Sequence, residues 1–249
     1  MTLHPDWLVP DWPAPPRVRA FVTTRAGGVS EGEYATLNLG ARSGDEPARV
    51  AANRGAVRAH LPSEPAWLAQ VHGNAVADLD ALADDAQPQA DAAATSVPGR
   101  VAVVLTADCL PVFLCRDDGS RVAVAHAGWR GLAAGVLENA VAAVGGPPGR
   151  VLAWLGPAIG PRAFEVGPEV REAFAGVHRE AGSAFVPRGG GKYLADLYAL
   201  ARLRLAKAGV AAVSGGGFCT WTERGRFFSY RREKLSGRMG AFIWIDGGH

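Results

Sequence analysis

The apolar positions between residues 101 and 131 form three short runs, which polar segments separate. Residues 101–105, 110–115 and 122–125 are rich in valine, leucine and alanine and have the length of buried strands. Asp108 and Cys109 follow the first run, and His126 follows the third. We therefore expect a thiol and an imidazole at the ends of neighbouring strands. Such a pair is typical of a metal site or of a nucleophile with its base.

The rest of the pattern predicts further elements on both sides of this stretch. A strand at residues 67–72 ends in His72. Asp45 and Pro47 predict the start of a helix that Pro62 ends. Other helices are predicted at residues 132–144, 168–175 and 194–208. Other strands are predicted at residues 18–24, 75–79, 151–155, 210–214, 226–231 and 241–245, with an irregular connection at 80–96.

The order of these elements favours an α+β fold. Strands come in hairpin-like pairs between single helices, which fits a mixed sheet better than a strictly alternating parallel one. The chain has 249 residues, 48% of them hydrophobic, and no shift in composition divides it. We expect one domain over residues 1–249. It opens with a proline-rich arm, whose prolines are Pro5, Pro10, Pro13, Pro15 and Pro16.

Charge and cysteine content narrow the classes of function. The net charge is +2 and the basic residues are scattered, which argues against a nucleic-acid surface or an anionic-membrane patch. We find neither a signal-peptide pattern nor an apolar run of about 18 residues, so we expect a cytoplasmic protein. The three cysteines, an odd number, do not suggest a disulfide framework and are expected to be reduced.

His72, Cys109 and His126 could together hold a catalytic zinc ion. Such a site typically has three protein ligands and an open position, whereas a structural site would show paired short spacings such as C-x-x-C. The alternative is that each of the three is structural, or that Cys109 is a nucleophile with His126 as its base. Asp108 is a candidate for proton transfer or for supporting a ligand, and equally for a structural hydrogen bond.

A series of short motifs runs nearly end to end along the chain. They are TTR at 23–25, GGVS at 27–30, LNLG at 37–40, GD at 44–45, NR at 53–54, QVHG at 70–73, ADA at 90–92, TADCLPV at 106–112, HAGWRG at 126–131, LGPAIGP at 155–161, FEVG at 164–167, CT at 219–220 and FFSYRR at 227–232. With these motifs the chain resembles the laccase-domain family, also called the multicopper polyphenol oxidase or YfiH-type peptidoglycan editing factor family. Thr36 stands where serine is common in that family.

The resemblance implies a layered α/β/β/α fold and a zinc ion bound by His72, Cys109 and His126. It also implies a purine nucleoside phosphorylase that acts on adenosine, inosine and methylthioadenosine, with deamination of adenosine as a second activity. Its partners would be a purine nucleoside and phosphate, and the protein would be a monomer or a homodimer.

The two implied reactions make different demands on the residues. Deamination fits a water activated by zinc, but the H-x-E and P-C-x-x-C deaminase signature is absent, so Asp108 or Glu165 would have to move the proton. Phosphorolysis needs a phosphate site. The candidates for that site are Arg25, Asn38, Arg130 and Arg231. Ordinary surface ion pairing is the alternative role of each arginine.

The sequence is also compatible with other functions. Six histidines without an H-x-H pair disfavour a multicopper cluster, although one copper ion could replace zinc at the same ligands. A cysteine hydrolase that acts on peptidoglycan precursors, with Cys109 and His126 as its catalytic pair, is another hypothesis. A small-molecule sensor is a further, non-enzymatic one.

Overall fold

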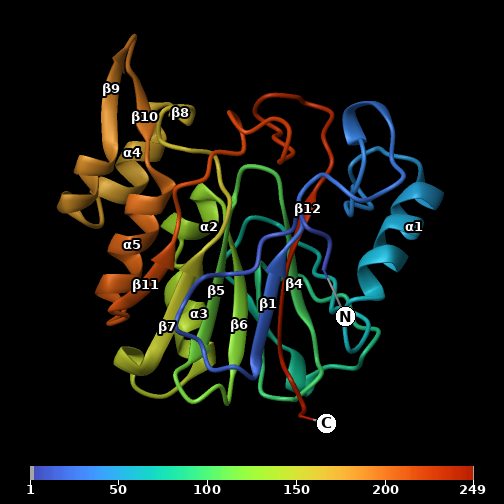
Figure 1. Cartoon of the computed structure of the whole chain (residues 1–249). Helices are drawn as coiled ribbons and strands as arrows, with labels where there is room; N and C mark the ends of the chain where they lie inside the picture. Colours follow the sequence, from blue (N-terminus) through green and yellow to red (C-terminus); the bar gives the residue numbers. More distant parts are fainter. Residues whose placement is uncertain (1–2, 249) are drawn as a thin grey trace.

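Two β-sheets pack face to face at the centre of the computed structural model, which describes residues 3–248 (Figure 1). Residues 1, 2 and 249 lie outside the described part. The larger sheet has six strands in the order β11-β7-β5-β6-β3-β2. Its outer pairs β11–β7 and β2–β3 are parallel and its inner pairs are antiparallel, so the sheet is mixed. The strands are β2 (Val76–Asp78), β3 (Ala92–Thr95), β5 (Leu110–Arg116), β6 (Val122–Ala127), β7 (Val151–Leu155) and β11 (Ala212–Gly215).

The second sheet has three antiparallel strands in the order β1-β12-β4. These strands are β1 (Val18–Val22), β4 (Ala102–Thr106) and β12 (Met239–Ile245). β12 is the central strand, although it comes last in the sequence. A third, small sheet, β8-β10-β9, projects from the upper edge of the molecule in Figure 1. It is formed by β8 (Glu165–Val166), β9 (Phe185–Gly189) and β10 (Lys192–Ala195).

Alternating side chains of the strands build the layers. Val104 of β4 faces the large sheet and packs with Phe113 and Trp154, whose rings stack at 5.6 Å. Val103, its neighbour in the same strand, points the other way and packs with Val57 of helix α1 (Pro47–Arg58). The sheet β1-β12-β4 therefore packs against other layers on both faces.

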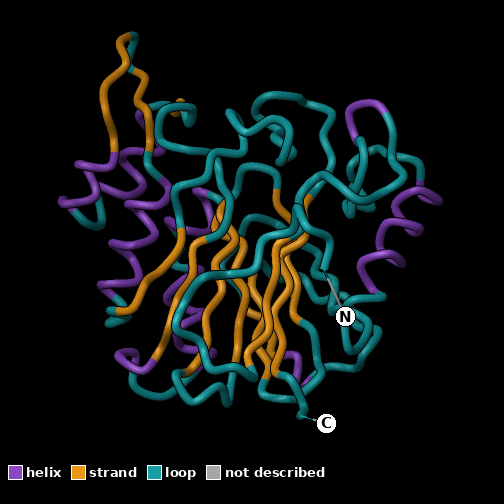
Figure 2. The backbone as a smooth tube through the Cα atoms, viewed as in Figure 1, coloured by secondary structure: helices purple, strands orange, loops and turns teal. Residues whose placement is uncertain are grey.

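Helices cover the two outer faces, as Figure 2 shows. Those on the large sheet are α2 (Trp129–Ala133), α3 (Val136–Val144), α4 (Pro168–Ala175) and α5 (Leu197–Lys207). α1 packs on the outer face of the sheet β1-β12-β4. The molecule thus has four layers, which confirms the predicted α/β/β/α class with mixed sheets. Short 3₁₀ helices occur at η1 (Gly32–Tyr34), η2 (Leu79–Ala81), η3 (Pro148–Arg150) and η4 (Arg179–Ala184). None of the described helices combines the length and apolar character that a membrane crossing needs.

Several predicted elements differ from the structure. Residues 67–72 are a loop, and residues 226–231 form a loop with turns at both ends instead of a strand. The segment predicted to be irregular, 80–96, contains the buried strand β3. Gly135, with a φ of 94°, divides the helix predicted at 132–144 into α2 and α3. Asp45 does not cap α1, because its carboxylate accepts hydrogen bonds from Ser30 and Asn38.

Candidate metal centre

His72, Cys109 and His126 meet at one end of the large sheet. Cys109 lies in the connection between β4 and β5, and His126 lies in β6, where it pairs with Pro111 of the neighbouring strand. His72 comes from the loop before β2. The potential ligand atoms of the three residues all lie within 4.8 Å of one another. The structure thus brings together the three side chains that the sequence pattern singled out.

Asp91 supports both histidines, and sequence reasoning missed it. Its side chain is fully buried, and Oδ1 accepts a hydrogen bond from Nδ1 of His126 at 2.8 Å. The same carboxylate accepts from the backbone N–H groups of Val71, His72 and Gly73 at 3.1, 2.9 and 2.7 Å. The signal that could have revealed it is a lone aspartate among the small residues of the segment 90–94. One carboxylate therefore orients both imidazole ligands.

The acid–base state of this group is set by the pairing of Cys109 with the histidines. Burial opposes ionisation of the Cys109 thiol, but the charge of His126 and hydrogen bonds with His126 and His72 lower its pKa to about 6. Burial likewise opposes protonation of His126, yet Cys109 and Asp91 raise its pKa to about 9. Burial also disfavours the charged form of Asp91, but its bonds from His126, Gly73 and Val71 outweigh this effect and lower its pKa. Without a metal and between about pH 6 and 9, Cys109 is therefore a thiolate beside the imidazolium of His126.

The donor set and the surrounding space fit a zinc ion. Two imidazole nitrogens and one thiolate sulfur are ordinary zinc ligands, and three of them leave a position for another oxygen. Because Nδ1 of His126 bonds to Asp91, its Nε2 is the atom free to bind metal. Gly128 leaves the site open, since a Cβ there would lie 2.9 Å from Sγ of Cys109 and 3.1 Å from Cδ2 of His72.

Backbone strain occurs at two positions of the site. His72 and Asp108 have φ values of 61° and 89°, in the left-handed region that non-glycine residues rarely adopt. The bonds to Asp91 hold the first in place. The second is held by its own carboxylate, which accepts from the hydroxyl of Thr220 at 2.5 Å and from the backbone N–H of Arg231 at 2.7 Å. Asp108 thus ties the segment between β11 and β12, at the top of Figure 1, to the site.

The three ligands open into a cavity of about 790 Å³. Of the predicted site residues, His72, Cys109, His126, Asp108, Arg130 and Arg231 line it. Residues that sequence reasoning did not assign also line it. These include Arg42, Arg54, Trp67, Gln70, Trp129, Phe164, Tyr230 and Arg238. Five of them lie in motifs that carry the family resemblance, namely Arg54, Gln70, Trp129, Phe164 and Tyr230. The local sequence does not show that these side chains meet at one cavity, because they come from segments far apart in the chain.

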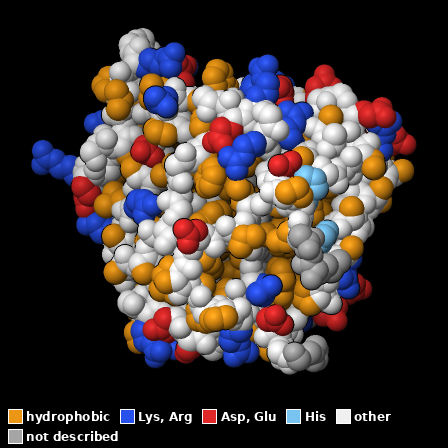
Figure 3. Space-filling model, viewed as in Figure 1, with side chains coloured by type: hydrophobic (Ala, Val, Ile, Leu, Met, Phe, Trp, Pro, Cys, Tyr) orange, Lys and Arg blue, Asp and Glu red, His pale blue; other side chains and the backbone are white. Residues whose placement is uncertain are grey.

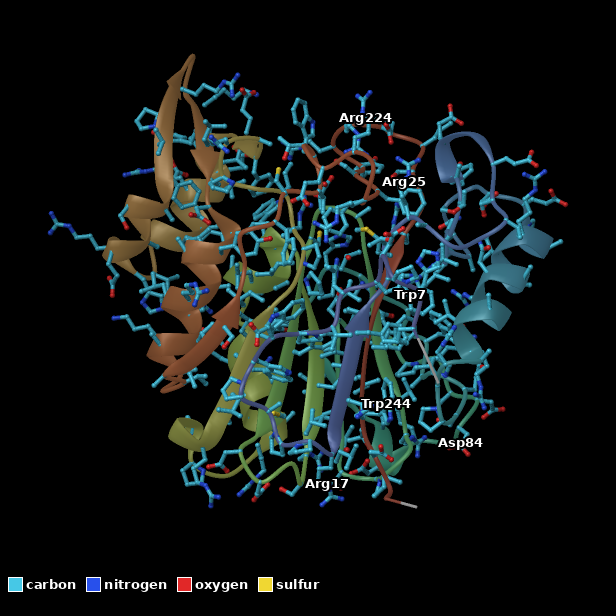
Figure 4. All side chains as sticks on the ribbon, viewed as in Figure 1. Trp7, Arg17, Arg25, Asp84, Arg224 and Trp244 are labelled. Atoms are coloured by element: carbon cyan, nitrogen blue, oxygen red, sulfur yellow. The ribbon has the colours of Figure 1, made fainter. Side chains whose placement is uncertain are left out.

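The structure does not bring Arg25 or Asn38 to the cavity wall. Nε of Arg25 donates to the carbonyl of Ala35 at 2.8 Å and Nη1 donates to that of Arg224 at 3.1 Å. Figure 4 shows Arg25 and Arg224 together among the loops above β12. Asn38 is buried and accepts from the backbone N–H groups of Gly40 and Arg238, both at 2.9 Å. These two residues organise the loops behind the cavity.

The candidate proton carrier Glu165 and the free thiol of Cys115 both lie outside the cavity lining. Glu165 pairs with Arg188 at 3.2 Å and with Lys192 at 3.7 Å. Cys115 is fully buried, and burial raises the pKa of its thiol to about 12, which suits a small apolar residue. Charged side chains of both signs are interspersed over the face drawn in Figure 3.

Comparison with known proteins gives a consistent result. A family model described as multi-copper polyphenol oxidoreductase laccase matches residues 19–246. A purine nucleoside phosphorylase of Pseudomonas aeruginosa is 54% identical over 96% of this chain and 98% of its own length. The purine nucleoside phosphorylase YfiH of Escherichia coli is 55% identical with the same coverage. The crystal structure of a Neisseria meningitidis protein superposes with a TM-score of 0.93 at 50% identity, over 97% of this chain and 100% of that one.

Proposed function

The chain belongs to the multi-copper polyphenol oxidoreductase laccase family. Because its relatives in Pseudomonas aeruginosa and Escherichia coli are named purine nucleoside phosphorylases, we propose that this protein cleaves purine nucleosides with phosphate. Its substrates would be adenosine, inosine and methylthioadenosine, and deamination of adenosine would be a second activity. The observation that carries the proposal is one cavity that joins a His-Cys-His metal centre to several guanidinium groups.

The cavity has the size and the chemistry that this reaction needs. A volume of about 790 Å³ lies within the usual range of small-molecule sites. Phosphorolysis joins a phosphate oxygen to C1′ of the ribose and breaks the bond from C1′ to the purine nitrogen, which leaves with the electron pair. Five arginines line the cavity against one carboxylate residue, Asp108, among residues 3–248, which favours an anionic co-substrate. Trp129, Phe164 and Tyr230 line the same cavity and add aromatic surface for the purine, with Arg130 and Arg231 lying over the rings of the first two.

His72, Cys109 and His126 would hold the zinc ion. Zinc, when bound there, supplies a Lewis acid that polarises an oxygen atom in the cavity. Asp91 keeps His126 in the tautomer that presents Nε2, and Gly128 keeps the approach to the ligands clear. Copper at the same ligands is the alternative metal. Among residues 3–248 these three form the one group of three or more histidine, cysteine or acidic side chains close enough to share an ion.

Asp108 is the carboxylate that we retain as the proton carrier for deamination. It lines the cavity beside Cys109, whereas Glu165 pairs with two cations outside it. Oδ1 of Asp108 accepts from the hydroxyl of Thr220 and Oδ2 accepts from the backbone N–H of Arg231, so a proton on Asp108 would use the remaining lone pair of either oxygen.

A second function is favoured by one specific observation. Cys109, His126 and Asp91 have the order of a nucleophile, a base and an orienting carboxylate, with a thiol pKa of about 6. This arrangement would also suit a cysteine hydrolase that acts on peptidoglycan precursors. The two functions differ in their need for metal.

The test combines metal analysis of the purified protein with analysis of products from adenosine and phosphate. Bound zinc and free adenine would support phosphorolysis, and inosine would support deamination. If neither product forms, and if the metal-free protein still hydrolyses amide substrates, the result would favour the hydrolase. We also propose a cytoplasmic location, because the three cysteines are free as in a reducing compartment. We propose a monomer or a homodimer.

A further inference from the structure

Arg54 and Arg238 differ from the other arginines of the cavity. Arg42, Arg130 and Arg231 are exposed, so water satisfies much of their charge. Arg54 and Arg238 are partly buried, and burial lowers the pKa of both guanidinium groups. Within residues 3–248, neither forms an ion pair with an acidic side chain. A partly desolvated cation without a counterion is costly, and an anion in the cavity would offset that cost.

Both guanidinium groups are held in place by their surroundings. The Arg54 group lies over the ring of Trp67, 3.8 Å from its centroid, and its Nε donates to the carbonyl of Leu39 at 3.0 Å. Nη1 of Arg238 donates to the carbonyls of Ser236 and Gly237 at 2.6 and 3.0 Å. Donors remain free on each: both Nη atoms of Arg54, and Nε and Nη2 of Arg238, have no partner among the described residues.

One short segment, residues 38–40, fixes the two arginines relative to the cavity. It accepts the Nε–H of Arg54 at Leu39, and it bonds the backbone of Arg238 at both Asn38 and Leu39. Gly40 makes room for the stem of Arg238, because a Cβ there would lie 2.7 Å from its Cγ. Arg238 lines the same cavity as Cys109 and Asp108, and the negative charges of these two groups act on its guanidinium group.

We propose that Arg54 and Arg238 form the subsite that binds inorganic phosphate, beside the metal centre of the same cavity. This inference rests on the proposed phosphorolysis and names the residues that hold its co-substrate. Two fixed guanidinium groups match the charge of a phosphate dianion, and their free N–H groups match its oxygens. Asn38 then acts by positioning Arg238 and does not touch the anion. The exposed Arg130 and Arg231 are left to contact the nucleoside.

The test is phosphate binding by calorimetry, measured apart from turnover, on the zinc-loaded protein. Arg54→Met and Arg238→Met should each weaken the affinity for inorganic phosphate about 10-fold or more, and the Michaelis constant for phosphate should rise in parallel. Arg49→Met is the matched control: it lies on the same helix, pairs with Glu31 and Glu46, and should bind phosphate as the parent does. Arg54→Lys and Arg238→Lys, which keep the charge, should recover part of the loss.

The outcomes separate this subsite from the proposed reaction. Zinc content and melting temperature identify variants that failed to fold. If a methionine variant fails to fold, the phosphate affinity of the lysine variant at the same position decides. Phosphate affinity equal to the parent's in folded Arg54→Met and Arg238→Met overturns the subsite, even if the enzyme phosphorolyses nucleosides. If these two variants lose affinity for adenosine monophosphate but not for inorganic phosphate, the subsite is overturned as well. Phosphate binding that depends on both arginines supports it, even if no phosphorolysis is found and the proposed reaction fails.

Discussion

At the scale of single residues, the site depends on one buried carboxylate. Asp91 bonds to the ring of His126 and to the backbone on both sides of His72, so it fixes two ligands that come from separate segments. Partners of this kind hold a ligand at the correct angle and tautomer before the metal arrives. The contribution of Asp91 is therefore measurable as metal affinity.

Asp91→Asn should weaken zinc binding about 10- to 100-fold, because an amide cannot accept all four hydrogen bonds that the carboxylate accepts. Competition with a chelator measures the affinity. Asp84→Asn is the control, since the Asp84 side chain is 98% exposed and pairs only with Arg100. Equal zinc affinities in the two variants would show that Asp91 does not organise the ligands.

Cys109→Ser distinguishes a zinc ligand from a nucleophile. If Cys109 binds zinc, the variant loses most of its metal together with its activity, because a serine hydroxyl is a poor zinc ligand. Elemental analysis and a nucleoside assay measure the two properties. Cys219→Ser, a half-buried thiol outside the cavity lining, is the control. An inactive Cys109→Ser protein with full zinc occupancy would favour the covalent mechanism instead.

Zinc affinity should depend steeply on pH between about 6 and 9. Zinc needs the Cys109 thiolate, already present above its pKa of about 6, and neutral His126, which forms only above its pKa of about 9. Binding therefore displaces one proton in this window, and the affinity should rise about tenfold per pH unit. Below pH 6 two protons are displaced and the dependence becomes steeper. Zinc titrations at a series of pH values test this slope.

The stability of the metal-free protein should respond differently. The lowered pKa of Cys109 contributes stability that is full above its ordinary value of 9.0 and is lost as pH falls toward 6. The raised pKa of His126 contributes stability that is full below its ordinary value of 6.5 and is lost as pH rises toward 9. Between 6.5 and 9 folded and unfolded chains hold equal numbers of protons on this pair, so its effect on unfolding by urea should be flat. A strong slope there would contradict the thiolate–imidazolium pair.

At the scale of elements, the structure explains what the sequence could predict. The runs around Cys109 and His126 are apolar and almost entirely buried, so their strands and the meeting of the two side chains were predictable. Strand β3 was missed because its residues Ala92, Ala93 and Ala94 have little strand propensity and owe their conformation to pairing with β6. Residues 226–231 have the pattern of a strand, but Phe227 and Phe228 are buried in a loop. Arg54 on α1 and Arg238 just before β12 reach the cavity only through tertiary packing, which no local pattern encodes.

The start of α2 offers a test of the space around the metal. Gly128 has a φ of −65°, which alanine adopts without strain, yet the added methyl would press on Cys109 and His72. Gly128→Ala should fold and lose zinc affinity by about 10-fold or more, as when a ligand is misplaced. Gly55→Ala, in α1 with nothing near its Cβ, should instead stabilise the protein by about 0.5–1 kcal/mol. Zinc competition and thermal unfolding measure the two effects.

At the scale of the whole molecule, stability comes from the stacking of the two sheets. Phe113 lies between them, fully buried against Trp154, whereas Val186 of β9 is 60% exposed. Phe113→Ala should cost about 3–5 kcal/mol of unfolding free energy in urea, and Val186→Ala less than about 0.5 kcal/mol. Zinc affinity of the folded Phe113→Ala protein should be unchanged, since this phenylalanine does not line the cavity. A selective loss of zinc would mean that the sheet interface and the site are coupled.

The central place of β12 has a consequence for synthesis on the ribosome. The metal ligands and the large sheet's inner strands emerge well before β12, yet β1 and β4 both pair with β12. Until residues 239–245 leave the ribosomal tunnel, each of these two strands has an open edge along which another nascent chain could add. Throughout this period the growing chain carries two strands without their native partner, which exposes it to aggregation.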